Sequence, residues 1–88
     1  MLNEEQCWTA VVAQFLRSDL AAAPFLGKAK GIGQETEAHA YIGIMAAIAG
    51  NRDDAMRHLE WVEGRGSKGY TEYRLALAEL KRLHATPR

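Results

Sequence analysis

The segment GRGSKG, residues 64–69, spells the G-x-G-x-x-G pattern of a dinucleotide-binding loop. In that loop the glycines let a pyrophosphate approach the backbone at the start of a helix, and a buried strand must come directly before them. Here a helical pattern precedes the glycines, and the sequence holds no β-α-β pattern. We therefore expect residues 64–69 to connect two helices, with Arg65 and Lys68 in solvent.

The histidines and the single cysteine do not form a catalytic or metal-binding set. His39, His58 and His84 lie 19 and 26 residues apart, and the sequence has neither an HExxH motif nor paired CxxC motifs. Cys7 stands beside Trp8 on an apolar face, so we expect it in the core rather than as a nucleophile. The sequence thus predicts a protein that is not an enzyme and that needs no cofactor or metal ion.

Four acidic residues are candidates for general acid or base catalysis, but their positions favour a structural role. These residues are Glu35, Glu37, Asp53 and Asp54. All lie near predicted helix starts, where the helix macrodipole stabilises a carboxylate.

The 88 residues have the length and composition of one small globular domain, with 48% hydrophobic and 25% charged residues. Eleven basic residues balance eleven acidic ones, whereas a nucleic-acid-binding protein normally shows a basic face. A single cysteine and the absence of a signal sequence or membrane-spanning apolar run predict a cytoplasmic protein. A periplasmic location is expected only if the chain is an excised domain of an exported protein.

Apolar residues that recur at three- and four-residue steps predict five helices and no strands, hence an all-α fold. The first helix follows an N-cap at Asn3, and the second is short and opens at Ser18 or Asp19. The glycines of residues 27–33 are expected to form a flexible connector. The fifth helix covers about residues 70–84.

The third and fourth helices are expected to form a hairpin. The third covers about residues 35–49, and Gly50 supplies a left-handed stop. Asn51 or Asp53 then caps the fourth helix.

A period of 34 residues runs through these helices. The positions that share their character along this period are Trp8, Ile42 and Ala76; Val12, Ala46 and Leu80; Phe15, Ala49 and Leu83; Ala21 and Ala55; and Phe25 and Leu59. The matched positions share residue type rather than identical residues. The period fails at some positions; Met45, for example, corresponds to Glu79.

The hairpin resembles a tetratricopeptide (TPR) repeat. The residues that carry this resemblance are Gly43, Gly50, Ala55, Leu59 and Val62. They stand where such a repeat places its small and large packing residues, and Gly43 would there leave space for a side chain of the next helix. The resemblance implies a right-handed solenoid fragment in one domain, residues 1–88. Its parts are a degenerate hairpin (residues 1–33), the repeat hairpin (34–69) and a capping helix (70–88).

The runs EAHAYIG, HLEWV and TEYRLALAELKRL also look like the C-terminal module of bacterial TPR adaptor proteins. This resemblance implies a protein-interaction or scaffolding function. The partner would lie on the inner face of the third and fifth helices, which comprises Glu37, Ala40, Ile44, Ala47, Thr71, Arg74, Ala78 and Lys81. Because Arg74 and Lys81 form a basic edge, we expect a peptide or a partner helix with an acidic group.

Three alternatives stay open from the sequence. Ile44 would be unavailable if the first helix covered it, and Arg74 and Lys81 would then be ordinary solvated charges. The chain could instead be a small regulatory subunit that binds a small ligand between its helices, which a deep pocket with convergent polar groups would favour. An apolar flank around Tyr70, Leu75 and Leu83 could also be covered by a second copy, as a homodimer.

Overall fold

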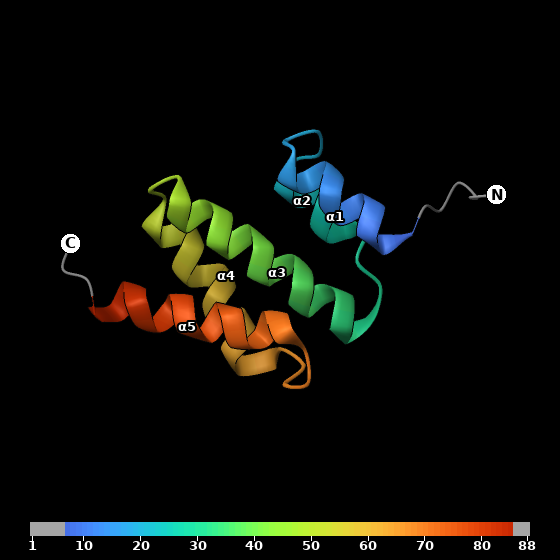
Figure 1. Cartoon of the computed structure of the whole chain (residues 1–88). Coiled ribbons are helices and arrows are strands. Elements are labelled where there is room, and N and C mark those ends of the chain that lie inside the picture. Colours follow the sequence, from blue (N-terminus) through green and yellow to red (C-terminus); the bar gives the residue numbers. More distant parts are fainter. Residues whose placement is uncertain (1–6, 86–88) are drawn as a thin grey trace.

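The computed structural model describes residues 7–85, which form five helices joined by short connections (Figure 1). The helices are α1 (Trp8–Leu16), α2 (Ala22–Gly27), α3 (Gly31–Ile48), α4 (Arg52–Arg65) and α5 (Thr71–Ala85). The described residues contain no strand, so the predicted all-α class and the five helices are confirmed. None of these helices is long and apolar enough to cross a membrane.

The start of α1 differs from the prediction. Asn3 lies outside the described residues, and the residue at the N-cap position is Cys7, whose side chain makes no capping hydrogen bond. The Cys7 side chain is exposed, so its predicted place in the core is wrong. The physical reason is its position ahead of the first helical turn, which keeps it off the apolar face on which Val11 is buried.

The helix α3 begins at Gly31, earlier than the sequence predicts, so the expected flexible connector over residues 27–33 is wrong from Gly31 onward. Gly31 opens the helix with φ of 84°, and the Lys30 amide donates to Gln34 Oε1 at 2.8 Å. The hydroxyl end of the Tyr70 ring lies against Gly33, so a side chain at this position would require Tyr70 to move. This glycine is therefore explained by a tertiary contact rather than by flexibility.

The turn between α3 and α4 forms as predicted. Gly50 takes φ of 86°, which is the left-handed conformation of a helix stop. Of the two candidate caps the structure uses Asn51, whose side-chain oxygen accepts from the Asp54 amide at 3.3 Å.

Two apolar clusters lie on opposite sides of α3. On one side, Ala38 and Ile42 pack with Phe25 of α2, whose ring stacks between Phe15 and Trp8 of α1 at centroid distances of 4.4 and 5.4 Å. The larger cluster, on the other side, joins α3 to α4 and α5. Its fully or nearly fully buried residues are Ala40, Ala55, Leu59, Val62, Ala76, Leu80 and Leu83. Because α3 is covered on two sides, it is the central helix of the molecule (Figure 1).

Two side-chain hydrogen bonds link helices that are distant in the sequence. Trp8 Nε1 donates to Glu37 Oε1 at 2.5 Å and ties α1 to α3. Tyr41 Oη donates to Glu72 Oε2 at 3.0 Å and ties α3 to α5. Burial, and then the bond with Glu72, raises the pKa of Tyr41 to about 12, so its hydroxyl keeps the proton that it donates.

Candidate functional site

The predicted partner-binding residues on α3 lie mostly inside the protein. Ala40 is 0% exposed and belongs to the cluster that α4 and α5 share, so it offers no surface to a partner. Ile44 and Ala47 are half-buried against the same cluster, and it is this cluster rather than α1 that covers Ile44. Glu37 is engaged by Trp8. An open groove along α3 is therefore not what the structure shows.

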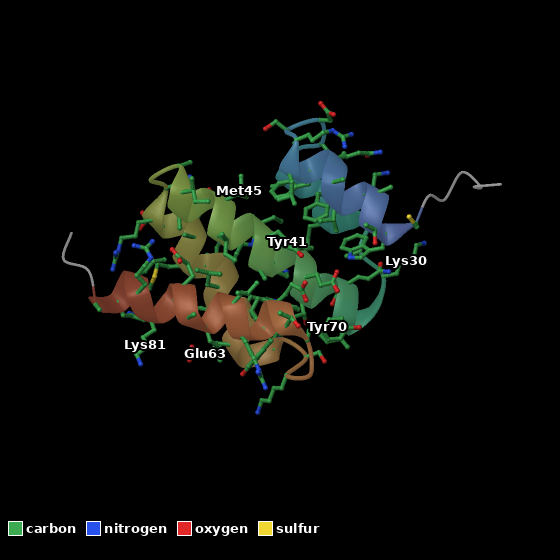
Figure 2. The ribbon with its side chains drawn as sticks, in the orientation of Figure 1. Lys30, Tyr41, Met45, Glu63, Tyr70 and Lys81 are labelled. Carbon is green, nitrogen blue, oxygen red and sulfur yellow. The ribbon has the colours of Figure 1, made fainter. Side chains whose placement is uncertain are left out.

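The predicted partner-binding residues on α5 are all exposed. They are Thr71, Arg74, Ala78 and Lys81, which we call the outer face of α5. Their helical spacing places them opposite the buried residues Ala76 and Leu80. Figure 2 shows Lys81 extending from α5 away from the other helices. The structure thus divides the predicted site into an internal half on α3 and an open half on α5.

The predicted apolar flank of α5 is only partly present. Tyr70 and Leu75 are 38% and 48% exposed, as the prediction requires. Leu83 is only 6% exposed and lies in the larger cluster, so its predicted place on the flank is wrong. The helical register explains this difference, since Leu83 follows Leu80 by three residues and shares its buried side.

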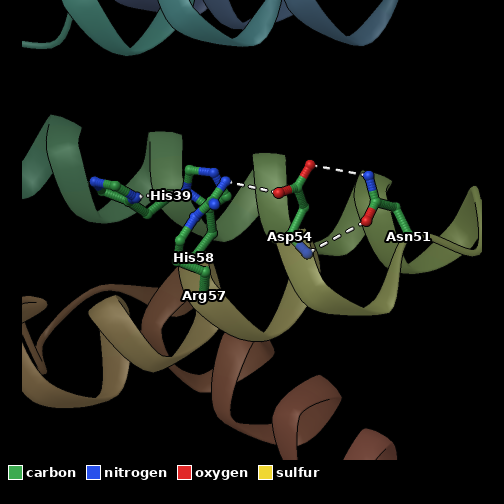
Figure 3. A network of polar contacts seen from close by, with 5 residues as sticks. All are labelled: His39, Asn51, Asp54, Arg57 and His58. Atoms are coloured by element: carbon green, nitrogen blue, oxygen red, sulfur yellow. Dashed lines mark hydrogen bonds and ion pairs between the residues drawn. The ribbon is translucent and has the colours of Figure 1, made fainter.

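A pair of histidines bridges α3 and α4 (Figure 3). His39 Nδ1 and His58 Nδ1 are 2.9 Å apart, so one ring donates a hydrogen bond to the other, and the His39 ring also stacks on Trp61 at 4.0 Å. Burial, and then the charge that His58 would carry, lowers the pKa of His39 to about 4. Burial also lowers the pKa of His58. Both rings are therefore neutral at pH 7 and form a structural contact rather than a charged site.

No sequence motif reveals this pair, because only the fold of the hairpin brings the two histidines together. The two histidines are far apart in the sequence, but they stand at similar distances on either side of the turn at Gly50. Once that turn is placed, an antiparallel hairpin brings them together.

The polar network of α4 continues beyond the histidines. Asp54 accepts from Arg57 at 2.6 Å through one oxygen and from the Asn51 amide nitrogen at 2.9 Å through the other (Figure 3). The charge of Asp54 is therefore balanced by Arg57. Among the described residues, no group of three or more histidines, cysteines and carboxylates could hold a metal ion.

A half-open pocket of about 500 Å³ lies between the α1–α2 hairpin, α3 and the first turns of α4. Its apolar wall includes Phe15, Leu26 and Ile42, and its polar rim consists of Asp54, Arg57 and His58. The rim residues all come from α4. Sequence analysis did not single out this pocket, because it forms between segments that only the tertiary fold brings together.

The G-x-G-x-x-G segment connects α4 to α5, as predicted. Gly64 and Arg65 end α4, and the following loop is tied to α3 by the hydroxyl of Thr36. This hydroxyl accepts from the Ser67 amide at 2.8 Å and donates to the Ile32 carbonyl at 2.7 Å. The Ser67 amide is thus used inside the protein rather than presented to a phosphate.

Comparison with known proteins adds no family to this description. No protein-family model matches the chain, no curated protein matches it, and no solved structure matches it. The resemblance to TPR proteins accordingly rests on the residues of this chain alone.

Proposed function

We propose that the protein is a non-catalytic interaction module of the TPR type, which binds a peptide or a partner helix on the outer face of α5. One observation carries this proposal. The residues that precede this face by the 34-residue period are Glu37, Ala40, Ile44 and Ala47 on α3. On that face, Ala40, Ile44 and Ala47 are covered by the cluster that α4 and α5 supply, and Glu37 is bonded to Trp8 of α1. The outer face of α5 therefore repeats the position of an occupied docking face, yet it is exposed in the described part of the chain.

The residues of this face indicate the chemistry of the partner. Arg74 and Lys81 are exposed and flank the small residue Ala78. Leu77 stands where α3 has Gly43, so a partner helix cannot approach α5 as closely as α4 approaches α3. Long basic side chains suit contacts at that larger distance, and an acidic peptide or helix complements them.

The repeat character of the core supports the same proposal. Phe25 and Leu59 are one period apart and both fully buried. Ile42 and Ala76 are also one period apart, and their side chains are 5% and 0% exposed. Helix-hairpin arrays with such a repeat commonly serve as binding surfaces for other proteins. The single cysteine, Cys7, suits a reducing compartment, so we propose a cytoplasmic location, and the resemblance to TPR adaptors supports a bacterial source.

A charge-reversal pair tests this proposal. Arg74→Glu with Lys81→Glu should abolish capture of a protein partner that the wild-type chain retains from native lysate, and leave the circular dichroism spectrum and Tm unchanged. The matched control is Lys28→Glu with Lys30→Glu, which makes the same change of charge at two exposed positions between α2 and α3. The proposal fails if the α5 variant retains the same partner as the control. Sedimentation of the wild-type chain shows whether that partner is a second copy.

A further inference from the structure

The pocket beside α4 is open in part because α3 carries a small residue where α5 carries a leucine. Leu80 and Leu83 fill the space between α5 and the α3–α4 hairpin and are 3% and 6% exposed. One period before Leu80, α3 has Ala46, which lines the pocket, and one period before Leu83 stands Ala49, which is exposed just after the end of α3. The α1–α2 hairpin does not compensate, since it presents Ala22 and Ala23 to the same space. Small residues at several positions of the sequence therefore leave the space that forms the pocket.

The walls of this pocket are apolar, whereas its polar groups are gathered on one side. Met45 extends the apolar wall on α3, and Figure 2 shows it on the side of α3 that faces the α1–α2 hairpin. On the rim, Asp54 and Arg57 already form an ion pair, and His58 is uncharged and bonded to His39 through Nδ1. The rim thus carries no net charge and leaves His58 Nε2 for a hydrogen bond.

We propose that this pocket is a binding site for a small uncharged ligand with an aromatic-sized apolar body and one hydrogen-bonding group. Its volume of about 500 Å³ falls within the roughly 300–1,000 Å³ of pockets that bury small molecules. A charged ligand would have to compete with the Asp54–Arg57 pair, whereas an uncharged one leaves that pair intact. This site lies on a different part of the molecule from the outer face of α5 and does not depend on the function proposed there.

Two fluorescent probes with the same ring skeleton test the proposal. N-phenylnaphthylamine is uncharged, and anilinonaphthalenesulfonate adds a sulfonate; each brightens in apolar surroundings. Titration of the wild-type chain should show saturable binding of the uncharged probe and weaker binding of the sulfonate. Ala46→Leu places at this position the residue that α5 has at Leu80, and it should weaken binding of the uncharged probe at least about tenfold.

Two further variants keep this test decisive. Ala23→Leu fills the pocket from the exposed surface of α2 and should have the same effect if Ala46→Leu does not fold. Ala85→Leu makes the same exchange at an exposed position of α5 and should leave binding unchanged. The proposal is overturned by an absence of saturable binding, by tighter binding of the sulfonate, or by unchanged binding in the folded pocket variants. It is also overturned if the wild type sediments as a dimer that Ala46→Leu makes monomeric, since a second copy would then occupy the pocket.

Discussion

Gly43 of α3 and Leu59 of α4 meet where the two helices cross. A Cβ atom built on Gly43 would lie 2.6 Å from Cδ2 and 2.7 Å from Cγ of Leu59. Leu59 is fully buried, so its side chain has no open space into which to move. Glycine in a helix interior costs about 1 kcal/mol relative to alanine. Here it allows the close contact on which the α3–α4 hairpin depends.

Gly43→Ala should therefore destabilise the protein by about 1–3 kcal/mol, because overpacking at Leu59 outweighs the gain in helix propensity. Urea unfolding followed by circular dichroism measures this difference. The matched control is Gly64→Ala in α4, where nothing lies within 4 Å of the added Cβ. That variant should be stabilised by up to about 1 kcal/mol. Equal effects of the two substitutions would contradict the role assigned to Gly43.

The features that sequence analysis predicted are those set by local signals. Gly50 and Asn51 mark the α3–α4 turn through their own conformations, and the spacing of Ala55 and Leu59 marks the buried side of α4. The start of α3 could not be predicted in this way, because Gly33 is explained only by Tyr70 on a distant loop.

The candidate site was predicted less completely for a related reason. Stepping by 34 residues relates positions on α3 to positions on α5, but it does not say which of the two faces another helix covers. Ala40 is fully buried, whereas Arg74, which follows it by one period, is exposed. The sequence left open a ligand pocket between the helices but did not locate it, because the small side chain of Ala46 has meaning only once Leu80 is seen to fill the equivalent space.

Thr36 provides a second stability prediction. It is fully buried, and its hydroxyl joins the Ile32 carbonyl to the Ser67 amide. Thr36→Val keeps the shape but leaves the Ser67 amide without its acceptor, so the free energy of unfolding should fall by about 1–3 kcal/mol. Amide hydrogen exchange at Ser67 should be faster in Thr36→Val than in the wild type. Thr36→Ser keeps the hydroxyl and should keep the wild-type exchange rate at Ser67. If Thr36→Val exchanged there no faster than Thr36→Ser, this bridge would have no role.

The histidine pair predicts a loss of stability in mild acid. In the unfolded chain His39 takes up a proton as the pH falls through its ordinary pKa of 6.5, whereas in the folded protein it does so only near 4. The folded state is therefore increasingly disfavoured as the pH falls from 6.5 to 4, and His58 acts in the same direction. After allowance for the partly exposed rings, the loss should be roughly 1–2 kcal/mol.

Urea unfolding at several pH values between 7 and 4 measures this loss, because this interval covers the pH range over which the histidines take up protons. The double variant His39→Gln with His58→Gln should be less stable at neutral pH, because the ring stacked on Trp61 is removed. Its stability should nevertheless fall less steeply over the same interval. A pH dependence as steep as that of the wild type would assign the effect to the carboxylates instead.

The placement of Phe25 and Leu59 in separate apolar clusters predicts that the two parts of the protein can unfold separately. Both are fully buried, but Phe25 belongs to the cluster that holds the α1–α2 hairpin and Leu59 to the cluster that joins α3, α4 and α5. Phe25→Ala, at a cost of about 3–5 kcal/mol, should release α1 and α2 while the other helices stay protected. Leu59→Ala should instead expose amides in α3, α4 and α5. Hydrogen exchange measured by mass spectrometry separates these outcomes, because local opening confines fast exchange to one segment. Equal loss of protection along the whole chain in Phe25→Ala would show instead that the two clusters unfold as one cooperative unit.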